Sequence, residues 1–342
     1  MEKKLPRTPS FNEIQELCLP RIEERLREFF AKMEKQGFGC TAGMSAYHLS
    51  SGGKRLRALM PCWIFAASGR DPLEAVPLGC AVELIHNATL VHDDLQDRDT
   101  VRRGMPTVWV KHSDVQAINC GDALFYFANE ILFEQKLSPE SFLRVMRRLS
   151  RGTLQVIEGQ AQEFLMKDEK QPTLSRYTEV VRGKTAALIA ASIVAALDAL
   201  GADEGFCEHV ERVAMLSGEL FQVQDDLLDI YGNKQRDRRA TDIAEGKVSA
   251  LIACLNEKAS PAEKLRVAEI LATPREKTTE AQIDEVLALF DRYDIRGTLL
   301  RQLRQIQSTV QNDPILSGHS KVQAVLVELN ERFLDPIRHL FS

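Results

Sequence analysis

Two clusters of aspartate residues carry the clearest chemical signal in the sequence. Each follows a largely apolar helical stretch, and they read Asp93-Asp94-Leu95-Gln96-Asp97 and Asp225-Asp226-Leu227-Leu228-Asp229. In a helix, the first and last aspartates of a cluster share one face, one turn apart, where their charges repel. Mg²⁺ suits such a setting, because it keeps several waters and binds one or two carboxylates together with substrate phosphates. Two clusters facing each other therefore predict a cage for a metal-bound diphosphate.

A short acidic run can also be a solvated helix end, where aspartate is common. That alternative explains one cluster as well as the metal site does. It explains two clusters of identical spacing less well, because each is preceded by apolar residues, at 90–91 and 220–221. We therefore favour the metal site.

A diphosphate also needs cations for its remaining oxygens, and the segment 52–57 (GGKRLR) could supply them. It is a flexible turn that opens a helix, where free N–H groups and the helix dipole favour an anion. Lys54, Arg55 and Arg57 add charge, and arginine can bind phosphate through two donors. A basic, solvated helix start remains the alternative for this segment taken alone.

Two further groups could serve the same purpose. The adjacent Arg102 and Arg103 should point in different directions and could bind two separate phosphates. Lys184-Thr185, predicted to open an alanine-rich helix, forms the last group together with Lys247. A lysine that leads an apolar run is often only a helix end with its charge in water.

Two polar residues align with the carboxylates. His86 lies two turns before Asp93 on nearly the same face, and Gln222 lies three residues before Asp225. A polar residue on an apolar face is more often a hydrogen-bonded core residue than a ligand. Their alignment favours a role in the site.

Composition indicates a helical protein. The chain has 342 residues, of which 44% are hydrophobic and 27% charged, as in ordinary globular proteins. Apolar residues recur at helical spacing, and no strands are predicted. The net charge of −5 gives no support for nucleic-acid binding. The longest apolar run, 186–197, is too short to span a bilayer and predicts a buried central helix.

The cysteines and the N-terminus bear on location. Seven cysteines are scattered without a CxxC pair, which favours a reducing compartment over disulfides or a zinc site. The first residues lack the apolar core of a signal peptide. We therefore expect a cytoplasmic protein with no transmembrane segment.

No linker divides the sequence, so we expect one domain over 1–342, a bundle of many helices around a deep cavity. The predicted helices are 11–35, 41–50, 55–68, 72–97, 113–135, 139–168, 173–200, 204–231, 247–257, 261–272, 279–293, 295–311 and 320–341.

Taken in order, these motifs resemble those of the trans-isoprenyl diphosphate synthases. The resemblance covers roughly residues 50–255 and is specific as a combination, although no single piece of it is. The matching segments are GGKRLR (52–57), ELIHNATLVHDDLQD (83–97), RRGMPT (102–107), EGQ (158–160), GKTAAL (183–188), FQVQDDLLD (221–229) and EGK (245–247).

The resemblance implies an all-α isoprenoid synthase fold and a homodimeric prenyltransferase. Such an enzyme condenses isopentenyl diphosphate head-to-tail with dimethylallyl, geranyl or farnesyl diphosphate. It implies Mg²⁺ as the cofactor, about three ions per active site. The implied metal ligands are Asp93, Asp97 and Asp225, with Asp229 as a further or water-mediated ligand. Asp94 and Asp226 would support them.

The resemblance also assigns the substrates. Isopentenyl diphosphate would be held by Lys54, Arg57, His86 and Arg103. The allylic diphosphate would be held by Arg102, Lys184, Thr185, Gln222 and Lys247. The residues expected to act in catalysis are Asp93, Asp94, Asp97, Arg102, Lys184, Gln222 and Asp225.

Two positions depart from the family's pattern. Trp109 stands where many members have a histidine, and the segment before Asp242 lacks the usual lysine. Arg238 or Arg239 could replace that lysine. A class I terpene cyclase and a non-catalytic partner subunit are the rival interpretations. A cyclase would not need a second diphosphate site, and a partner subunit could lose the carboxylates that are intact here.

Product length should depend on the helix that carries Asp93. One helical turn is about 5.4 Å, close to one extended isoprene unit, so positions on this helix mark cavity depth. Short-chain relatives block the cavity with an aromatic residue four or five places before Asp93, where this chain has Ala88 and Thr89. The next candidate floor is Phe125-Tyr126, backed by Ile157, although these could also be ordinary core residues. We expect geranylgeranyl diphosphate, with longer chains or farnesyl diphosphate as alternatives.

Overall fold

The computed structural model describes residues 8–169, 171–232 and 240–341. The packing divides the chain into two compact units. The first unit comprises Met1–Leu154, Leu188–Glu211 and Ser320–Val325, and the second comprises Gln155–Ala187, Arg212–His319 and Leu326–Ser342. The expected single domain over 1–342 stays a prediction.

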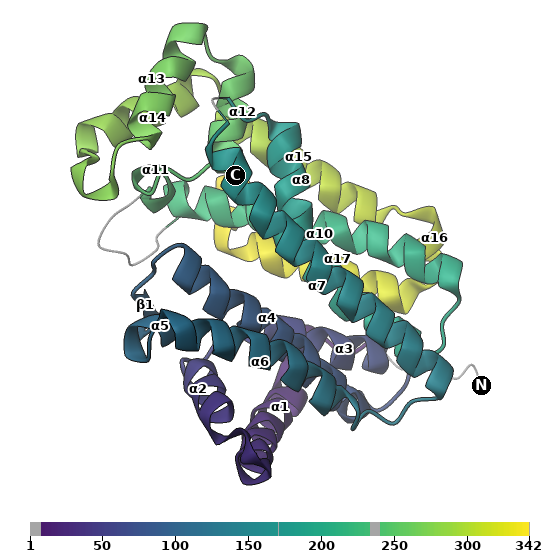
Figure 1. The fold of residues 1–342 in the computed structure, drawn as a ribbon. Helices are drawn as coiled ribbons and strands as arrows, with labels where there is room; N and C mark the ends of the chain where they lie inside the picture. The colour runs from purple at the N-terminus through teal and green to yellow at the C-terminus, as the bar shows by residue number, and fades with distance from the viewer. Residues whose placement is uncertain (1–7, 170, 233–239, 342) are drawn as a thin grey trace. The chain divides into compact units, whose positions relative to one another are not determined.

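Almost all of the first unit is helical (Figure 1). Its elements up to residue 132 are α1 (Phe11–Met33), the π-helical turn η1 (Glu34–Phe38), α2 (Gly39–Ser50), α3 (Leu56–Ala67), the 3-10 turn η2 (Pro72–Ala75), α4 (Val76–Gln96), β1 (Val101–Arg102), β2 (Met105–Pro106), α5 (Val108–Lys111) and α6 (Asp114–Leu132). The helices α7 (Pro139–Lys167), α9 (Ala187–Ala199) and α10 (Glu204–Tyr231) each contribute residues to both units.

The remaining elements belong wholly or mainly to the second unit. They are α8 (Leu174–Val181), the π-helical turn η3 (Arg182–Ala186), α11 (Thr241–Ala244), α12 (Ala250–Lys258), α13 (Pro261–Leu271), η4 (Arg275–Lys277), α14 (Glu280–Arg292), α15 (Ile295–Gln311), α16 (Pro314–Ser317), α17 (Ser320–Leu334) and η5 (Asp335–Phe341). Phe221 of α10 packs against Phe333 of α17, with ring centroids 4.6 Å apart.

Local sequence explains where many helices begin. Ser10 caps α1 in a capping box with Glu13, and Ser260 does the same for α13 with Glu263. Ser249 caps α12, so this helix begins at residue 250 rather than at the predicted 247. These caps satisfy backbone N–H groups that a helix start otherwise leaves without partners.

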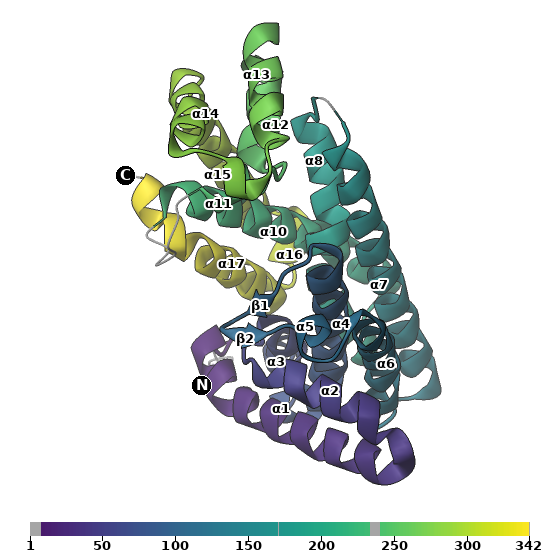
Figure 2. The ribbon, with the colours of Figure 1, turned by 60° about the vertical axis from the view of Figure 1, so that its left-hand side comes forward.

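α4 is the central helix of the first unit. It lies between α3 and α6 in Figure 2, and it packs against both of them. Every residue from Val82 to Ile85 is buried, whereas the last turns become partly exposed from His86 onward. The helix therefore anchors its first half in the core and carries its aspartates to an accessible end.

The structure corrects three expectations about the elements. A short antiparallel hairpin is present, in which Val101 pairs with Pro106 and Arg102 with Met105. Lys184 does not open a helix, because it lies in the π-helical turn η3 within a continuous helical stretch. The last predicted helix is α-helical only to Leu334 and continues as a 3-10 helix.

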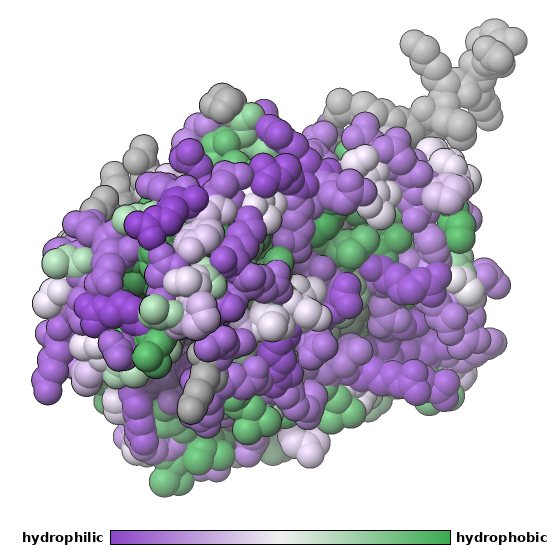
Figure 3. All heavy atoms as spheres, turned by 90° about the horizontal axis from the view of Figure 1, so that it is seen from above, coloured by the Kyte–Doolittle hydropathy of each residue, from purple (hydrophilic) through white to green (hydrophobic). Residues whose placement is uncertain are grey.

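The predicted helix at 186–197 is buried throughout, as expected. It belongs to a longer helical stretch, Leu174–Ala199, whose 26 residues are long and apolar enough to cross a membrane by length and composition alone. However, 83% of its most apolar window is buried inside the protein, as in the core helix of a globular fold. The face of the molecule shown in Figure 3 is mainly hydrophilic, with apolar residues in scattered places.

Candidate active site

The three aspartates of the first cluster separate into two directions. Asp93 is half-buried and Asp97 is exposed at the C-cap of α4, where its N–H donates to the Asp93 carbonyl oxygen at 2.8 Å. The side chain of Asp94 is only 1% exposed and pairs with Arg102 at 2.6 Å. Burial raises the pKa of the Asp94 carboxyl, and the Arg102 guanidinium opposes this shift. Asp93 and Asp97 thus present oxygens outward, while Asp94 is turned inward.

The β1–β2 hairpin places the two adjacent arginines. Arg103 and Gly104 form its tip with positive φ angles of 50° and 79°, the geometry of a tight two-residue turn. Arg102 reaches back to Asp94, and the Arg103 guanidinium donates to the Gly52 carbonyl oxygen instead. The two side chains therefore contact different parts of the first unit, Arg102 the end of α4 and Arg103 the turn before α3.

Gly53 explains why the turn before α3 contains glycine. Its φ is 140°, and a Cβ atom there would lie 2.5 Å from Nη1 of Arg103. The Arg103 guanidinium rests on the bare backbone of this turn. Lys54 follows this turn directly and is exposed.

Arg55 supports the same turn from inside the unit. It has a left-handed backbone with φ 47° and a side chain that is 1% exposed. Its guanidinium donates to Glu23 of α1 at 2.8 Å, to Glu83 of α4 at 2.9 Å and to the Leu49 carbonyl oxygen at 2.7 Å. One side chain therefore fastens α1, α2 and α4 to the start of α3.

Arg57 and His86 meet across α3 and α4. Nη1 of Arg57 lies 3.3 Å from Nε2 of His86, so the guanidinium donates to a neutral imidazole. Burial and Arg57 hold the pKa of His86 well below its ordinary value. Burial also lowers the pKa of Arg57, which Glu83 opposes. The pair is a cationic donor group with few carboxylates to neutralise it.

Buried polar atoms without a protein partner gather in this part of the described chain. They are Nε2 of His48, Nε of Arg57, Oε2 of Glu83 and Oδ2 of Asp94. Buried polar atoms are usually hydrogen-bonded, so such a group indicates a place for water or a polar ligand. Burial, Arg102, Arg103 and Arg55 together lower the pKa of His48 to about 3.

In the second unit, the aspartates of the other cluster also differ from one another. Asp225 is half-buried. Asp226 is 1% exposed and accepts hydrogen bonds from Tyr177, Ala250 and Gln222. Asp229 accepts from the Thr241 hydroxyl at 2.6 Å and from the Asp242 N–H at 3.1 Å.

The remaining predicted residues of the second unit lie on neighbouring elements. Thr185 of η3 donates to Oε1 of Gln222 at 2.9 Å, and Lys184 pairs with Glu163 at 2.5 Å. Lys247 lies 3.5 Å from Asp242. Burial would lower the pKa of Lys247, but Asp242 and Asp226 outweigh it and raise that pKa. Burial raises the pKa of Asp242 to about 7.

Gly159 accounts for the EGQ motif. A Cβ atom at this position would collide with the backbone of Lys184, so α7 and η3 approach each other backbone to backbone. That close approach fixes the turn that carries Lys184 and Thr185. Arg238 and Arg239, the candidates for the missing cation, lie outside the described residues.

The residues predicted to set product length have different environments. Ala88 is fully buried, and Thr89 is half-buried with its hydroxyl donating to the His86 carbonyl oxygen. Phe125 is half-buried beside His92. Tyr126 is 73% exposed and Ile157 is 50% exposed. Within a single chain, these two side chains therefore do not form the floor of an internal cavity, contrary to the prediction.

The donor set of α4 fits a divalent ion. Among the described residues, no three His, Cys, Asp or Glu side chains already form a metal cage. Mg²⁺ does not need one, because one or two carboxylates suffice when phosphates and waters complete its shell. Asp93 and Asp97, one turn apart at the accessible end of α4, are such a pair.

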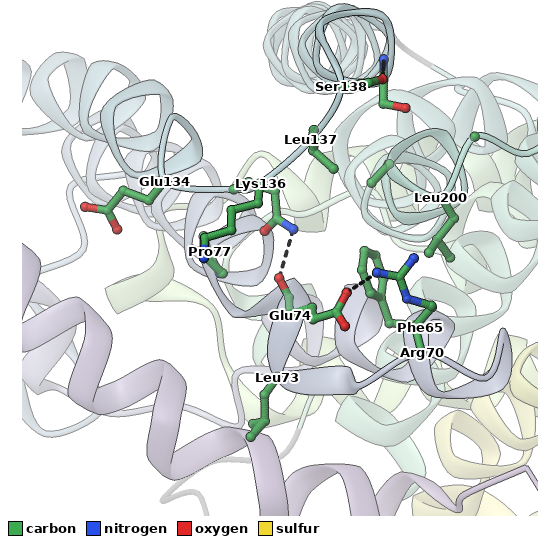
Figure 4. Close-up of a pocket in the computed structure, with 14 residues that line it drawn as sticks. Phe65, Arg70, Leu73, Glu74, Pro77, Glu134, Lys136, Leu137, Ser138 and Leu200 are labelled. Atoms are coloured by element: carbon green, nitrogen blue, oxygen red, sulfur yellow. Dashed lines mark hydrogen bonds and ion pairs between the residues drawn. The ribbon is translucent and has the colours of Figure 1, made fainter.

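Figure 4 shows a cavity of about 600 Å³ in the first unit that lies elsewhere. It includes Pro77, sixteen residues before Asp93 on α4, which is about 24 Å along the helix. Arg70 pairs with Glu74 there, and Gln135 donates to the Glu74 carbonyl oxygen at 2.8 Å. Its charged groups are largely paired, unlike the cationic group near α3.

Sequence reasoning missed several residues that build these clusters. Glu83, Tyr177 and Glu163 were not singled out, although each contacts a predicted site residue. Asp242 was named only to locate the segment that lacks the usual lysine, and no role was predicted for it. Glu83 lies three residues before His86 and so on the same face of α4, which was the available signal.

The fold is a helical bundle, and its candidate site combines outward carboxylates with arginines, a set suited to a metal-bound phosphate substrate. The polyprenyl synthetase family model matches residues 40–290. A short chain isoprenyl diphosphate synthase of Methanocaldococcus jannaschii is 34% identical over 77% of this chain and 79% of the relative. A farnesyl diphosphate synthase of Geobacillus stearothermophilus is 33% identical over 73% of this chain and 83% of the relative.

A solved structure has the same fold. The geranylgeranyl pyrophosphate synthetase of Pyrococcus horikoshii superposes with a TM-score of 0.79 at 27% identity, covering 94% of this chain and 98% of that one. The chain therefore belongs to the polyprenyl synthetase family. It has the all-α isoprenoid synthase fold and is a prenyltransferase of the isoprenyl diphosphate synthase type.

Proposed function

We propose that this prenyltransferase joins isopentenyl diphosphate to an allylic diphosphate with Mg²⁺, and that its main product is geranylgeranyl diphosphate. The observation that carries the proposal is the cationic group at the start of α3. Arg103 rests on the glycine turn there, Arg57 contacts His86, and the buried Nε of Arg57 has no hydrogen-bond partner in the protein. Such a group is suited to an anion with several oxygens.

Isopentenyl diphosphate is assigned to this group in the first unit. Lys54 and Arg103 flank the glycine turn, and Arg57 adds a fork of donors. The neutral His86 accepts from Arg57, which leaves its other ring nitrogen as a donor. The substrate would thus be held by its charged end, with its double bond directed away from the cations.

Following the resemblance, the allylic diphosphate is assigned to Arg102, Lys184, Thr185, Gln222 and Lys247. Asp93, Asp97 and Asp225 would hold the metal ions, about three of them. We do not propose Asp229 as a direct metal ligand, because the Thr241 hydroxyl and the Asp242 N–H each donate to one of its two carboxylate oxygens. It can still act through water.

The reaction follows from charge. Bound metal ions would neutralise the leaving diphosphate and so favour ionisation of the allylic C–O bond. Arg102 and the two lysines stabilise the same developing negative charge. Thr185, whose hydroxyl donates to Gln222, presents its oxygen to the allylic cation, and the double bond of isopentenyl diphosphate attacks that cation. The proton then lost passes most simply to the departing diphosphate.

The test is incubation of purified protein with isopentenyl and farnesyl diphosphates and Mg²⁺, followed by product identification. We expect condensation that stops when Mg²⁺ is chelated. Asp93→Ala and Asp225→Ala should remove most turnover but keep the helical circular dichroism. Asp291→Ala, on the exposed face of α14, is the matched control and should be fully active.

The same incubation separates the rival functions. A terpene cyclase would consume the allylic diphosphate without isopentenyl diphosphate. A non-catalytic subunit would give no product from any combination. Either result would overturn the proposal.

The proposed product length of twenty carbons is argued from the residues that α4 contributes to the wall of the cavity. Ala88 and Thr89 are too small to block a chain one turn from Asp93, and Phe125 on α6 is the remaining aromatic candidate for the floor. Phe125→Ala should lengthen the product. Thr89→Phe should shorten it to fifteen carbons, and it is a cleaner change than Ala88→Phe because Ala88 is fully enclosed. An unchanged product in both variants would place the floor elsewhere.

A homodimer is the proposed assembly. Val115, Ile118, Tyr126 and Phe133 are all exposed on α6 or at its C-cap and are large and apolar. On α7, exposed leucines at 143, 154 and 165 recur every eleven residues, which is about three helical turns and keeps them on one face. Exposed apolar stripes of this kind mark protein interfaces.

Seven free cysteines support the expected cytoplasmic location.

A further inference from the structure

A chain of hydrogen bonds in the second unit ends on Asp226. The Thr185 hydroxyl donates to Oε1 of Gln222 at 2.9 Å, and Nε2 of Gln222 donates to Oδ1 of Asp226 at 3.0 Å. The Tyr177 hydroxyl and the Ala250 N–H donate to Oδ2 of Asp226 at 2.6 and 2.7 Å. Every donor in the chain points toward the same carboxylate.

The surroundings of Asp226 do not suit a metal ligand. It is 1% exposed, and its hydrogen bonds occupy three of the roughly four acceptor positions of a carboxylate. Mg²⁺ keeps several waters and needs space for them. Asp225 is half-buried and lies about 100° around the helix, so it can face a metal while Asp226 faces the core.

The carboxylate fixes the orientation of the Gln222 amide. Only the NH₂ group of an amide can donate to a carboxylate, so the Gln222 oxygen must point to Thr185. The Thr185 hydroxyl then directs its proton to Gln222. As a result, the lone pairs of its oxygen are left on the side away from the chain.

We propose that Asp226 is a positioning residue that orients Gln222 and Thr185, so that the Thr185 oxygen faces the allylic cation with its negative end. This inference rests on the proposed function. Hydrogen bonds in such a chain polarise one another, which strengthens the dipole at the Thr185 oxygen. Tyr177 and the Ala250 N–H hold the carboxylate in place.

Asp226→Asn is the decisive change, because it reverses the chain. An asparagine can still accept from Tyr177 and Ala250 through its oxygen, but its NH₂ group then faces Gln222. The Gln222 amide must turn over, its NH₂ group meets Thr185, and the Thr185 proton is driven outward. The cation would then face a hydroxyl proton.

We expect Asp226→Asn to lower kcat by about a hundredfold, the lower end of the loss seen when one preorganised hydrogen-bonding group is removed from an active site. The Mg²⁺ concentration at half-maximal rate and both KM values should change by less than about twofold. Asp225→Asn is the matched comparison one residue away, and it should raise the Mg²⁺ requirement. A similar rise in Asp226→Asn would show that Asp226 binds metal and would overturn the inference.

A double-mutant cycle tests the chain itself. Thr185→Val removes the hydroxyl, so adding Asp226→Asn should lower kcat little further. Multiplicative losses would overturn the inference. Tyr177→Phe provides a second route if the asparagine variant does not fold; it should lower kcat by about threefold, and this loss should vanish in the Thr185→Val background.

Two controls guard against a general loss of stability and against an inactive enzyme. Asp198→Asn changes another carboxylate that is 1% exposed, held by Arg144 and Arg148 in the first unit, and should lower stability without lowering kcat. If the unmodified enzyme shows no Mg²⁺-dependent condensation at all, the proposed function fails rather than the role of Asp226. The two failures are therefore distinguishable.

Discussion

Arg55 offers the sharpest test of how the glycine turn is held. Replacing it with methionine removes a guanidinium whose side chain is 1% exposed and which donates to Glu23, Glu83 and the Leu49 carbonyl oxygen. Glu83, 4% exposed, would keep its charge with only an amide hydrogen bond from Asn87. Removing one partner of a buried ion pair costs about 3–5 kcal/mol. We therefore expect Arg55→Met to lower the free energy of unfolding by about 4 kcal/mol.

The double variant Arg55→Met/Glu83→Met separates stability from positioning. With both charges gone, no buried carboxylate is left uncompensated, and apolar replacements of buried pairs are often close to neutral. Urea denaturation should show at least about 2 kcal/mol recovered relative to the single variant. The KM for isopentenyl diphosphate should stay raised in both variants, because the turn is still detached from α1 and α4. The KM for the allylic substrate should change little.

Arg148→Met is the matched control. Arg148 pairs with Asp198 and Glu211 in the same unit, but Arg144 also binds Asp198 at 2.8 Å, so the carboxylate keeps a cation. We expect a smaller loss of stability and an unchanged KM. The buried-charge reasoning is refuted if the double variant is as unstable as Arg55→Met. The positioning role is refuted if recovered stability brings the KM back to normal.

Three further predictions use the same kind of measurement. Arg103→Ala should mainly raise the KM for isopentenyl diphosphate and Arg102→Ala that for the allylic substrate; lysine should replace either one poorly, and equal effects would defeat this division. Burial and three arginines lower the pKa of His48 to about 3 in the folded state, against 6.5 in the unfolded chain. Below pH 6.5 only the unfolded chain takes up this proton, so the free energy of unfolding falls as the pH falls. Between pH 6.5 and 5, the free energy of unfolding should fall about 2 kcal/mol more than in His48→Gln, and parallel curves would refute this. Ile118→Arg should convert a dimer to a monomer in light scattering, and a wild-type monomer at micromolar concentration would contradict the proposed assembly.

The helices could be read from the sequence because their signals are local. Apolar residues at helical spacing predicted α4, α6 and α10 to within a few residues. The hairpin at 101–106 was missed, since two-residue strands have no alternating pattern to detect. The π-helical turn at 182–186 was also missed. Gly159 of α7 approaches its backbone at Lys184, and local residue types do not reveal such a contact.

The site could be predicted as a set of residues but not as a set of contacts. Spacing placed Asp93 and Asp97 on one face, which is a property of any helix. Nothing local indicated that Arg55 would adopt a left-handed backbone and turn inward rather than serve as one more exposed cation. Its partners Glu23 and Glu83 lie 32 and 28 residues away, so only the fold brings them together.

The two aspartate clusters also show how one pattern can carry two kinds of carboxylate. The second aspartate lies about 100° around the helix from the first, and in both clusters it is 1% exposed. Asp94 meets a cation, Arg102, whereas Asp226 meets the neutral donors of Tyr177, Gln222 and Ala250. In each case the inner carboxylate orients a residue of the proposed site, the Arg102 guanidinium in one cluster and the Gln222 amide in the other. Paired aspartates therefore combine an outward residue that can bind metal with an inward residue that orients its neighbours, and substitution of the inner ones should spare the Mg²⁺ requirement.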